Sequence, residues 1–250
     1  NPYSPVVGFL GNPNFQSSFV GFSGVIAFAY LIQKTQKLLL RVAFLGYLLL
    51  AGYVISATDS QQGFLVLAGG AGIVVLIWVK SSNFSRLATP LCLASAVGAF
   101  IAILGTLNKG PFASILYKPS VTYRGDYWRA GWNMTLEHPI SGVGLDSYGD
   151  WYRRTRTIEA TLRRGPEITS NAAHNVLLDL SSNGGFPLLI AYLLFIVLTL
   201  IAVFKVFQKN KDVDPAFIAI VGGFVAFQAQ SVVSINQIGL AIWGWLFMGI

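Results

Sequence analysis

Six long runs of apolar residues constrain the fold of this chain more than any other feature of its sequence. Each run is close to the roughly 17–25 residues that an α-helix needs to cross the hydrocarbon core of a bilayer. Apolar residues cover all sides of these runs, as is typical of helices surrounded by lipid and by one another. We therefore expect an all-α fold, a polytopic transmembrane helical bundle with spans over Ser17–Ile32, Leu38–Ala57, Gly63–Val79, Leu87–Leu107, Phe186–Phe207 and Pro215–Val233.

The ionisable residues are few and unevenly placed. They make up 11% of the chain, whereas a typical soluble domain has about a quarter. The polar stretch Asn108–Ala173 and its exit contain both histidines, nine of the 17 Lys and Arg residues and seven of the 10 Asp and Glu residues. A membrane protein that gathers its ionisable groups in one extramembrane segment is expected to carry out its chemistry there.

These runs divide the chain into three predicted parts. Residues 1–107 form the N-terminal part of the bundle with about four spans, residues 108–185 form a long, partly helical outer loop, and residues 186–250 form the C-terminal spans. The last apolar stretch, Ile238–Ile250, is too short to span a bilayer, and the chain opens on Asn1 without a Met. We therefore expect a piece of a longer protein that lacks helices at both ends.

Basic residues in the short links predict which side of the membrane each link occupies. Two alternate links, Thr58–Gln62 and Ser234–Gln237, contain no Lys or Arg. By the positive-inside rule the basic links are cytoplasmic, so the N-terminal segment and the long loop lie outside; loops beyond about 60 residues escape the rule. This predicts a multi-pass protein of the cytoplasmic (inner) membrane whose active site faces outside. The basic link residues are Lys34, Lys37, Arg41, Lys80, Arg86, Lys205, Lys209 and Lys211.

Two other classes of function are not favoured by the composition. The net charge of +7 could indicate nucleic-acid binding, but its placement in the inner links and the outer loop favours membrane lipids as partners and no nucleic acid. Cys92 is the only cysteine and lies inside a predicted span. Neither a disulfide framework nor a cysteine-based metal site can therefore form within this chain.

Within the outer loop, residues 123–137 have helical character and end before His138-Pro139, as the residue before a proline should. Arg124, Trp128 and Trp132 fall on one face of this helix. One interpretation is an interfacial helix, with tryptophans at headgroup level and Arg124 beside lipid phosphates. The other is that the Arg124 guanidinium binds a lipid-linked diphosphate, which its planar fork suits.

Two further segments of the loop carry glycine or basic residues. In residues 138–144, Gly142 and Gly144 predict a tight turn with φ above zero that packs the loop against the membrane domain, and His138 is interpreted as a structural histidine. In the segment Trp151-Tyr152-Arg153-Arg154-x-Arg156, the arginines form either a solvated basic face or a contact with sugar and phosphate.

The exit of the loop, residues 170–180, predicts a short helix with Asn171 as its N-cap and His174 in its first turn. Gly184-Gly185 then ends this helix before Phe186-Pro187 begins the next span. A histidine near a helix N-terminus has its pKa lowered by the helix dipole, which favours the neutral imidazole that a general base needs. The alternative is a histidine that only caps its own helix.

The run Ala173-His174-Asn175, followed by an apolar stretch and Gly184-Gly185, resembles a signature of the O-antigen ligase and polymerase superfamily. That family has a His-Asn pair, a Leu-rich stretch and a Gly-x-x-Gly-like turn into a helix. Three more segments are similar to family motifs in the same order along nearly the whole chain: Gly11-Asn12-Pro13-Asn14, Arg124-x-x-x-Trp128, and His138-Pro139-Ile140-x-Gly142-Val143-Gly144.

The resemblance implies a metal-independent membrane glycosyltransferase of the GT-C type, without a cofactor. Such an enzyme moves a glycan from undecaprenyl diphosphate to the hydroxyl of a glycan or lipid-linked acceptor, as ligase or as polymerase. By the motif, His174 would be the general base and Arg124 would bind the donor diphosphate. The same resemblance makes Asn175 and Trp128 candidates for substrate binding.

One departure from the family pattern concerns the start of the third span. Family members often have Ser-Arg-Gly there, and the arginine is a second diphosphate ligand. Here the stretch is Asp59-Ser60-Gln61-Gln62-Gly63, with Gln62 in place of the arginine. Either Arg153, Arg154 or Arg156 supplies the missing charge, or the substrate differs, or the protein is inactive.

Two rival functions remain open at this point. A lipid-linked glycan transporter or flippase would bury ionisable sites near the bilayer midplane, but the predicted spans contain almost no charge away from their ends. A non-catalytic envelope-assembly protein is compatible with Gln62. Glycine pairs such as Gly69-Gly70 and Gly222-Gly223 are interpreted as sites of close helix packing.

Overall fold

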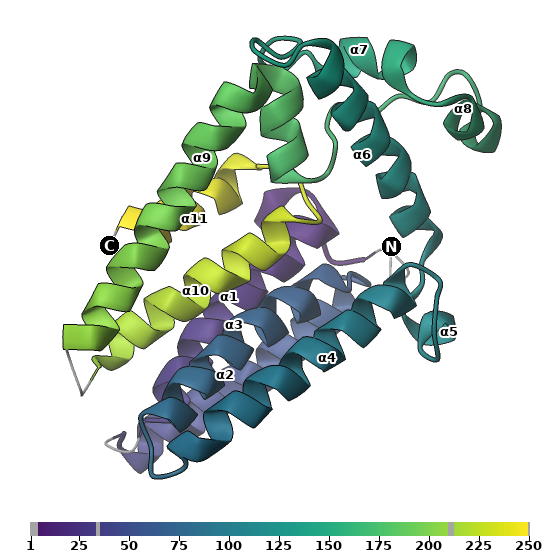
Figure 1. The fold of residues 1–250 in the computed structure, drawn as a ribbon. Coiled ribbons are helices and arrows are strands. Elements are labelled where there is room, and N and C mark those ends of the chain that lie inside the picture. Colours follow the sequence, from purple (N-terminus) through teal and green to yellow (C-terminus); the bar gives the residue numbers. More distant parts are fainter. Residues whose placement is uncertain (1–4, 34–35, 210–212, 250) are drawn as a thin grey trace. The chain divides into compact units, whose positions relative to one another are not determined.

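The computed structural model describes residues 5–33, 36–209 and 213–249, and its regular elements are all helical (Figure 1). The expected all-α class is confirmed. In chain order the elements are η1 (Gly8–Leu10), α1 (Pro13–Leu31), α2 (Leu38–Ala57), α3 (Gln62–Lys80), η2 (Ser85–Leu87), α4 (Ala88–Thr106), α5 (Ala113–Leu116), α6 (Pro119–Glu137), α7 (Tyr148–Thr155), α8 (Ile158–Arg164), α9 (Val176–Lys209), α10 (Pro215–Ser231) and α11 (Ile238–Gly249).

Four helical segments within the described residues are long and apolar enough to cross a membrane: α2, α3, the η2–α4 segment and α9. They coincide with four of the six predicted spans. The other two predicted spans are also helical but fall short. Helix α1 has polar residues such as Asn14 and Gln16 in its first turns, and α10 has only 17 residues.

The chain forms two compact units. The first unit contains Asn1–Leu91, Val197–Gln230 and Asn236–Ile250, and the second contains Cys92–Ile196 and Ser231–Ile235. Helices α4 and α9 each contribute residues to both units.

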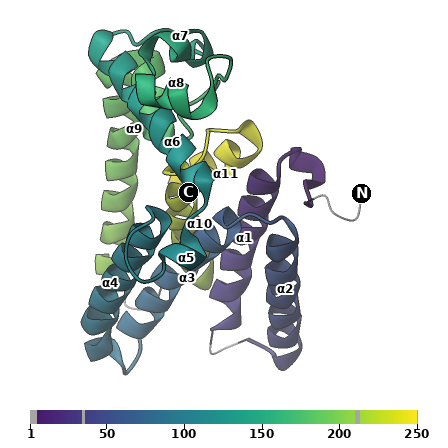
Figure 2. The same ribbon diagram turned by 90° about the vertical axis from the view of Figure 1, so that its right-hand side faces the viewer.

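Glycines allow the helices of the first unit to touch through their backbones. Helix α1 lies beside α2 and α3 (Figure 2). A Cβ on Gly63 would lie 2.7 Å from the carbonyl oxygen of Ser17, and one on Gly70 would lie 2.8 Å from the carbonyl oxygen of Gly222. Helices α1, α3 and α10 therefore meet closely, and the interpretation of Gly70 and Gly222 as packing glycines is confirmed.

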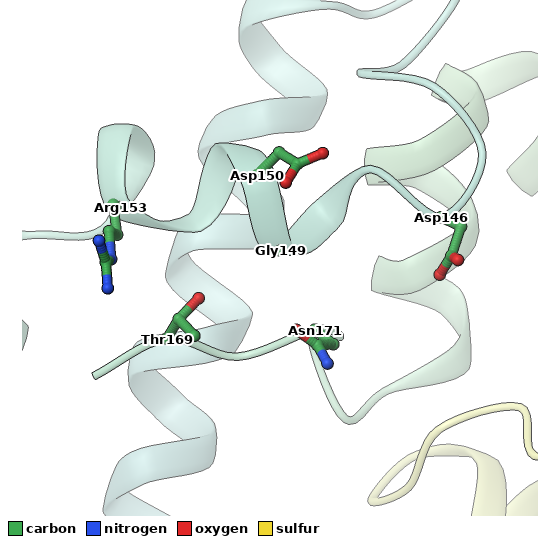
Figure 3. Close-up of a pocket in the computed structure, with 6 residues that line it drawn as sticks. All are labelled: Asp146, Gly149, Asp150, Arg153, Thr169 and Asn171. Carbon is green, nitrogen blue, oxygen red and sulfur yellow. The ribbon is translucent and has the colours of Figure 1, made fainter. Parts of the chain in front are cut away.

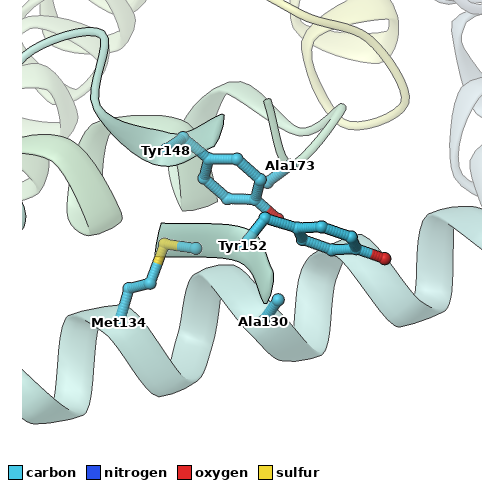
Figure 4. Packing of buried hydrophobic residues seen from close by; sticks show 5 residues of the cluster. All are labelled: Ala130, Met134, Tyr148, Tyr152 and Ala173. Atoms are coloured by element: carbon cyan, nitrogen blue, oxygen red, sulfur yellow. The ribbon is translucent and has the colours of Figure 1, made fainter. Parts of the chain in front are cut away.

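In the second unit, α7 packs on α6 around a small core. That core joins residues of α6, α7 and the segment before α9, namely Ala130, Met134, Tyr148, Tyr152 and Ala173 (Figure 4). Helix α6 begins at Pro119, where the missing proline N–H leaves no hydrogen bond unmade, and it ends at Glu137, before His138-Pro139, as predicted. This packing holds the segment that leads into α9 against α6.

The glycine turn of residues 138–144 attaches to a break inside α9. Gly142 and Gly144 have φ of 63° and 108°, and Gly185 in α9 has φ of 68°, so the predicted turn and the predicted helix end are both confirmed. The N–H of Val143 donates to the Ser182 carbonyl at 2.8 Å, and the N–H of Phe186 donates to the Pro139 carbonyl at 2.8 Å. The turn therefore satisfies backbone groups that the break leaves free.

Candidate functional site

Helix α9 begins one residue after Asn175, and Asn175 is its N-cap. The Asn175 Oδ1 accepts a hydrogen bond from the N–H of Leu178 at 3.1 Å, as an N-cap side chain does. The expectation that Asn171 caps this helix and that His174 lies in its first turn is therefore wrong. Two asparagines offer the same capping chemistry four residues apart, and the second one is used.

His174 precedes the helix and has a strained backbone, with φ of 56°. Three contacts hold it there. The N–H of Ala173 donates to Asp179 Oδ1 at 2.5 Å, Trp128 Nε1 donates to the His174 carbonyl at 3.4 Å, and the imidazole stacks on the Tyr127 ring with centroids 5.4 Å apart. The imidazole therefore has a fixed position on α6.

The pKa of His174 is lowered from its ordinary value of 6.5, first by burial and second by the nearby positive charge of Arg124. The direction agrees with the prediction, but its cause is different, because His174 lies outside the helix whose N-terminus was expected to act on it. The neutral imidazole is the favoured form at neutral pH, and it can accept a proton.

Arg124 is half-buried on α6, one turn before Trp128, and burial lowers its pKa. Arginine still keeps its charge in proteins. Within the described residues no salt bridge to Arg124 is found. A half-buried guanidinium without a carboxylate partner favours an anion from outside the chain.

Two neighbouring arginines differ from Arg124 because other side chains of the protein already bind them. Arg164 donates to the Tyr127 hydroxyl and lies over the Tyr123 ring, 4.3 Å from its centroid. Arg163 forms a salt bridge with Asp126 at 2.5 Å. These contacts fix α8 against α6.

The three arginines predicted to contact substrate have different surroundings. Arg156 donates to the carbonyls of Pro166 and Ile168, each at 2.7 Å, so it holds the segment after α8. Arg154 is exposed and lies over the Trp151 ring, 5.3 Å from its centroid. Arg153 is exposed beside Glu167, with 3.6 Å between the guanidinium and the carboxylate.

Among the other candidates, both polar atoms of the Asn175 amide bind backbone groups. Its Oδ1 accepts from the N–H of Leu178, and its Nδ2 donates to the Val232 carbonyl at 3.0 Å.

Gln62 is the first residue of α3, in the first unit, and is 5% exposed. Neither its Nε2 nor its Oε1 has a hydrogen-bond partner within the described residues. Because a buried, unpaired amide costs about 1–3 kcal/mol, Gln62 marks a place where a polar partner fits.

His138 has the surroundings of a structural residue. Its ring contacts the Trp151 ring edge-on, with centroids 4.8 Å apart, and its N–H continues the hydrogen bonding of α6 to Met134. The second unit thus brings together His174, Arg124, Trp128 and Asn175, while Arg153 and Arg154 lie on α7.

Sequence reasoning missed Asp179 and Tyr127 as parts of this site. Asp179 is the only acidic residue in the first turn of α9, and an acidic residue there often reaches back to a free N–H, which is a usable signal. Tyr127 gave no signal, because its contact with His174 joins residues 47 positions apart.

Comparison with known proteins places this chain in a family. No curated protein matches the chain. The family model described as O-antigen ligase matches residues 46–193, which include Gln62, Arg124 and His174. Because the match covers more than half of the chain, this multi-pass membrane protein belongs to the O-antigen ligase family.

Proposed function

We propose that the protein transfers a glycan from undecaprenyl diphosphate to an acceptor hydroxyl on the outer face of the cytoplasmic membrane, without a metal ion. Family membership gives it a role in membrane glycan transfer. The observation that carries the finer proposal is the pairing of a neutral, fixed imidazole, His174, with an unpaired, half-buried guanidinium, Arg124.

His174 acts as the general base in this proposal. Its neutral imidazole takes the proton of the acceptor hydroxyl as the acceptor oxygen forms a bond to the anomeric carbon of the donor glycan. The bond from that carbon to the diphosphate oxygen breaks, and undecaprenyl diphosphate leaves with the electron pair. The proton on His174 passes to solvent after the product departs.

Arg124 stabilises the negative charge that develops on the leaving diphosphate. A guanidinium at low exposure interacts more strongly with an anion than one in open water does, and its fork binds two phosphate oxygens. Gln62 provides an uncharged amide to the substrate, and Trp128 fixes the His174 carbonyl. Arg153 and Arg154 are the basic residues on α7 that remain exposed for substrate.

Metal independence is part of the proposal and rests on the side chains present. Within the described residues, no three His, Cys, Asp or Glu side chains gather as a metal site would require. The positive charge that a divalent ion would bring to a diphosphate is instead assigned to arginine.

The test is transfer by the purified protein in liposomes that contain an undecaprenyl-diphosphate-linked glycan. With a chelator present, we expect the glycan to appear on an acceptor and free undecaprenyl diphosphate to accumulate. A lipid-core acceptor would identify a ligase, and a second lipid-linked glycan a polymerase. Movement of the intact lipid-linked glycan across the bilayer, without a change in its linkage, would instead identify a flippase. Neither product nor movement would indicate a non-catalytic assembly protein.

A further inference from the structure

A polar cleft in the second unit contains neither His174 nor Arg124, and of its lining residues only Arg153 is assigned to the substrate above. Its volume is about 540 Å³, and six residues line it. Asp146, Gly149, Asp150 and Arg153 come from α7 and the residues before it, and Thr169 and Asn171 come from the segment that leads to His174 (Figure 3). Small-molecule sites have volumes of roughly 300–1,000 Å³, so this cleft can hold more than one sugar ring.

Three of the lining side chains are free to bind a ligand, whereas the Arg153 guanidinium also donates to the Glu167 carbonyl at 3.1 Å. Within the described residues, no hydrogen bond or salt bridge engages the side chains of Asp146, Asp150 or Asn171. The carboxylates accept hydrogen bonds, the Arg153 guanidinium donates them, and the Asn171 amide and Thr169 hydroxyl do both. A sugar hydroxyl also donates and accepts at once, so this mixed set of groups matches it.

The charge of the cleft argues against a phosphate ligand. The lining supplies two carboxylates and one guanidinium, and that guanidinium, on Arg153, also lies 3.6 Å from the Glu167 carboxylate. A diphosphate requires a surplus of cationic donors, which this lining does not have. A single divalent cation would leave most of the volume empty and would be repelled by Arg153.

The cleft is continuous in sequence with the candidate catalytic segment. Asn171 lies three residues before His174, and two hydrogen bonds hold the backbone between them. The Ser170 hydroxyl donates to the Ala172 carbonyl at 2.8 Å, and the Ala173 N–H donates to the Asp179 carboxylate. A Cβ on Gly149 would lie 2.9 Å from Asn171 Oδ1, so this glycine allows α7 to approach the segment closely. A ligand in the cleft therefore contacts the same segment that positions His174.

We propose that the cleft binds a neutral, hydroxyl-rich saccharide segment of the glycan substrate. This inference rests on the proposed glycan transfer, and the saccharide belongs to either the donor or the acceptor. The cleft thus selects sugars, while Arg124 is left to bind the diphosphate.

The test separates binding from transfer by using the His174→Ala protein in nanodiscs. The probe is the free oligosaccharide released by mild acid from the lipid-linked glycan of the producing cells, and binding is measured by saturation-transfer NMR titration. We expect the added changes Asp150→Asn and Asn171→Ala together to weaken binding about tenfold, as the loss of two hydrogen bonds predicts. The Glu137→Gln change removes an exposed carboxylate of the same unit outside the cleft and should leave binding unchanged.

Gly149→Ala is a second variant whose added methyl group would displace the Asn171 amide, and it should also weaken binding. The proposal is overturned if His174→Ala protein does not bind the oligosaccharide, if the cleft variants bind it as well as their parent does, or if inorganic pyrophosphate displaces it.

Transfer assays with the cleft variants, made in protein that keeps His174, distinguish the source of the saccharide. A raised KM for the lipid-linked donor identifies the donor glycan, and a raised KM for the acceptor identifies the acceptor glycan. If the unchanged protein transfers nothing but its His174→Ala form binds sugar in the cleft, the proposed function fails while the saccharide site stands. If transfer occurs and the cleft variants change neither binding nor KM, only the cleft proposal fails.

Discussion

Each unit has an apolar core, but the contacts that add to this core differ between the two. In the first unit, valines with no exposed surface and glycines bring helix backbones into contact, as at Gly70 and Gly222. In the second unit, polar side chains bind backbone atoms, as Arg156 and Asp179 do. The first kind of packing leaves little room for added side-chain volume. The second kind fixes polar groups in place, and that is what a reaction with a sugar hydroxyl needs.

The sharpest test of this contrast is His174→Ala. Loss of a general base should reduce transfer by at least about 10²-fold, while the thermal stability of the purified protein stays near that of the unchanged chain. His138→Ala is the matched control and should keep its activity, since the His138 ring packs edge-on against Trp151. Normal transfer by the His174→Ala protein would remove the general-base assignment.

Added volume in the first unit should break its packing instead. Gly70→Leu places atoms against Val25 and the Gly222 carbonyl, and we expect it to cost about 1–3 kcal/mol or more through overpacking. Gly72→Leu is the control, because a Cβ at Gly72 has no neighbour within 4 Å. Thermal denaturation in detergent measures both. Equal stabilities of the two variants would show that close backbone contact does not hold this unit together.

Changes at Arg124 test whether its guanidinium, which has no salt bridge within the described residues, binds the donor diphosphate. Arg124→Ala should raise the KM for the lipid-linked donor by roughly 10–100-fold, the range for a lost hydrogen bond to a charged group. Arg124→Lys should lose less, because it keeps the charge without the fork. Kinetics at varied donor concentration measure the difference. Equal losses in both variants would point to a structural arginine.

Changes at Asp179 test whether its hydrogen bond to the backbone next to His174 matters for transfer. Asp179→Ala leaves the N–H of Ala173 without its acceptor, and we expect transfer to fall roughly tenfold through misplacement of the imidazole. Asp179→Asn keeps an accepting oxygen and should restore most of the activity. The ratio of kcat between the two variants is the measurement, and similar kcat values would show that the Asp179 hydrogen bond does not position His174.

The smallest expected effect is on the titration of His174. Because its pKa lies below 6.5, the neutral, active form persists to lower pH, and transfer should decline only as pH falls through that lowered pKa. In Arg124→Ala protein the pKa should rise but stay below 6.5, since burial is the larger cause. NMR of labelled histidine in a His138→Asn background reads this one ring directly. A pKa at or above 6.5 in the parent would contradict the buried, neutral imidazole.

Much of the fold was predictable because its signals are local. Apolar runs, the His138-Pro139 stop and the glycines at 142, 144 and 185 each determine the backbone within a few residues, and the structure confirms them. The choice of Asn175 over Asn171 as N-cap was not predictable in this way. It depends on Asp179, which accepts from the N–H of Ala173, and on the Val232 carbonyl, which accepts from the Nδ2 of Asn175 itself.

The candidate site was predictable only in part. The residue types at His174 and Arg124 were recognisable from their chemistry and from the family motif. The stacking of Tyr127 on His174 and the use of Arg156 by backbone carbonyls arise from tertiary packing, which brings distant residues together. No spacing in the sequence distinguishes Arg156, which is engaged, from Arg153, which is exposed.

The break at Gly185 separates two demands on a single helix. Residues 186–209 have the length and composition of a membrane span. Residues 176–184 include Asp179, which binds the backbone next to His174. The 138–144 turn forms its hydrogen bonds at the break and therefore sets the direction of the shorter part. The exposed positions of the longer part do not take part in this attachment. The same break would let an engineer change exposed apolar positions such as Leu198 and Phe204 while the 138–144 turn stays in place.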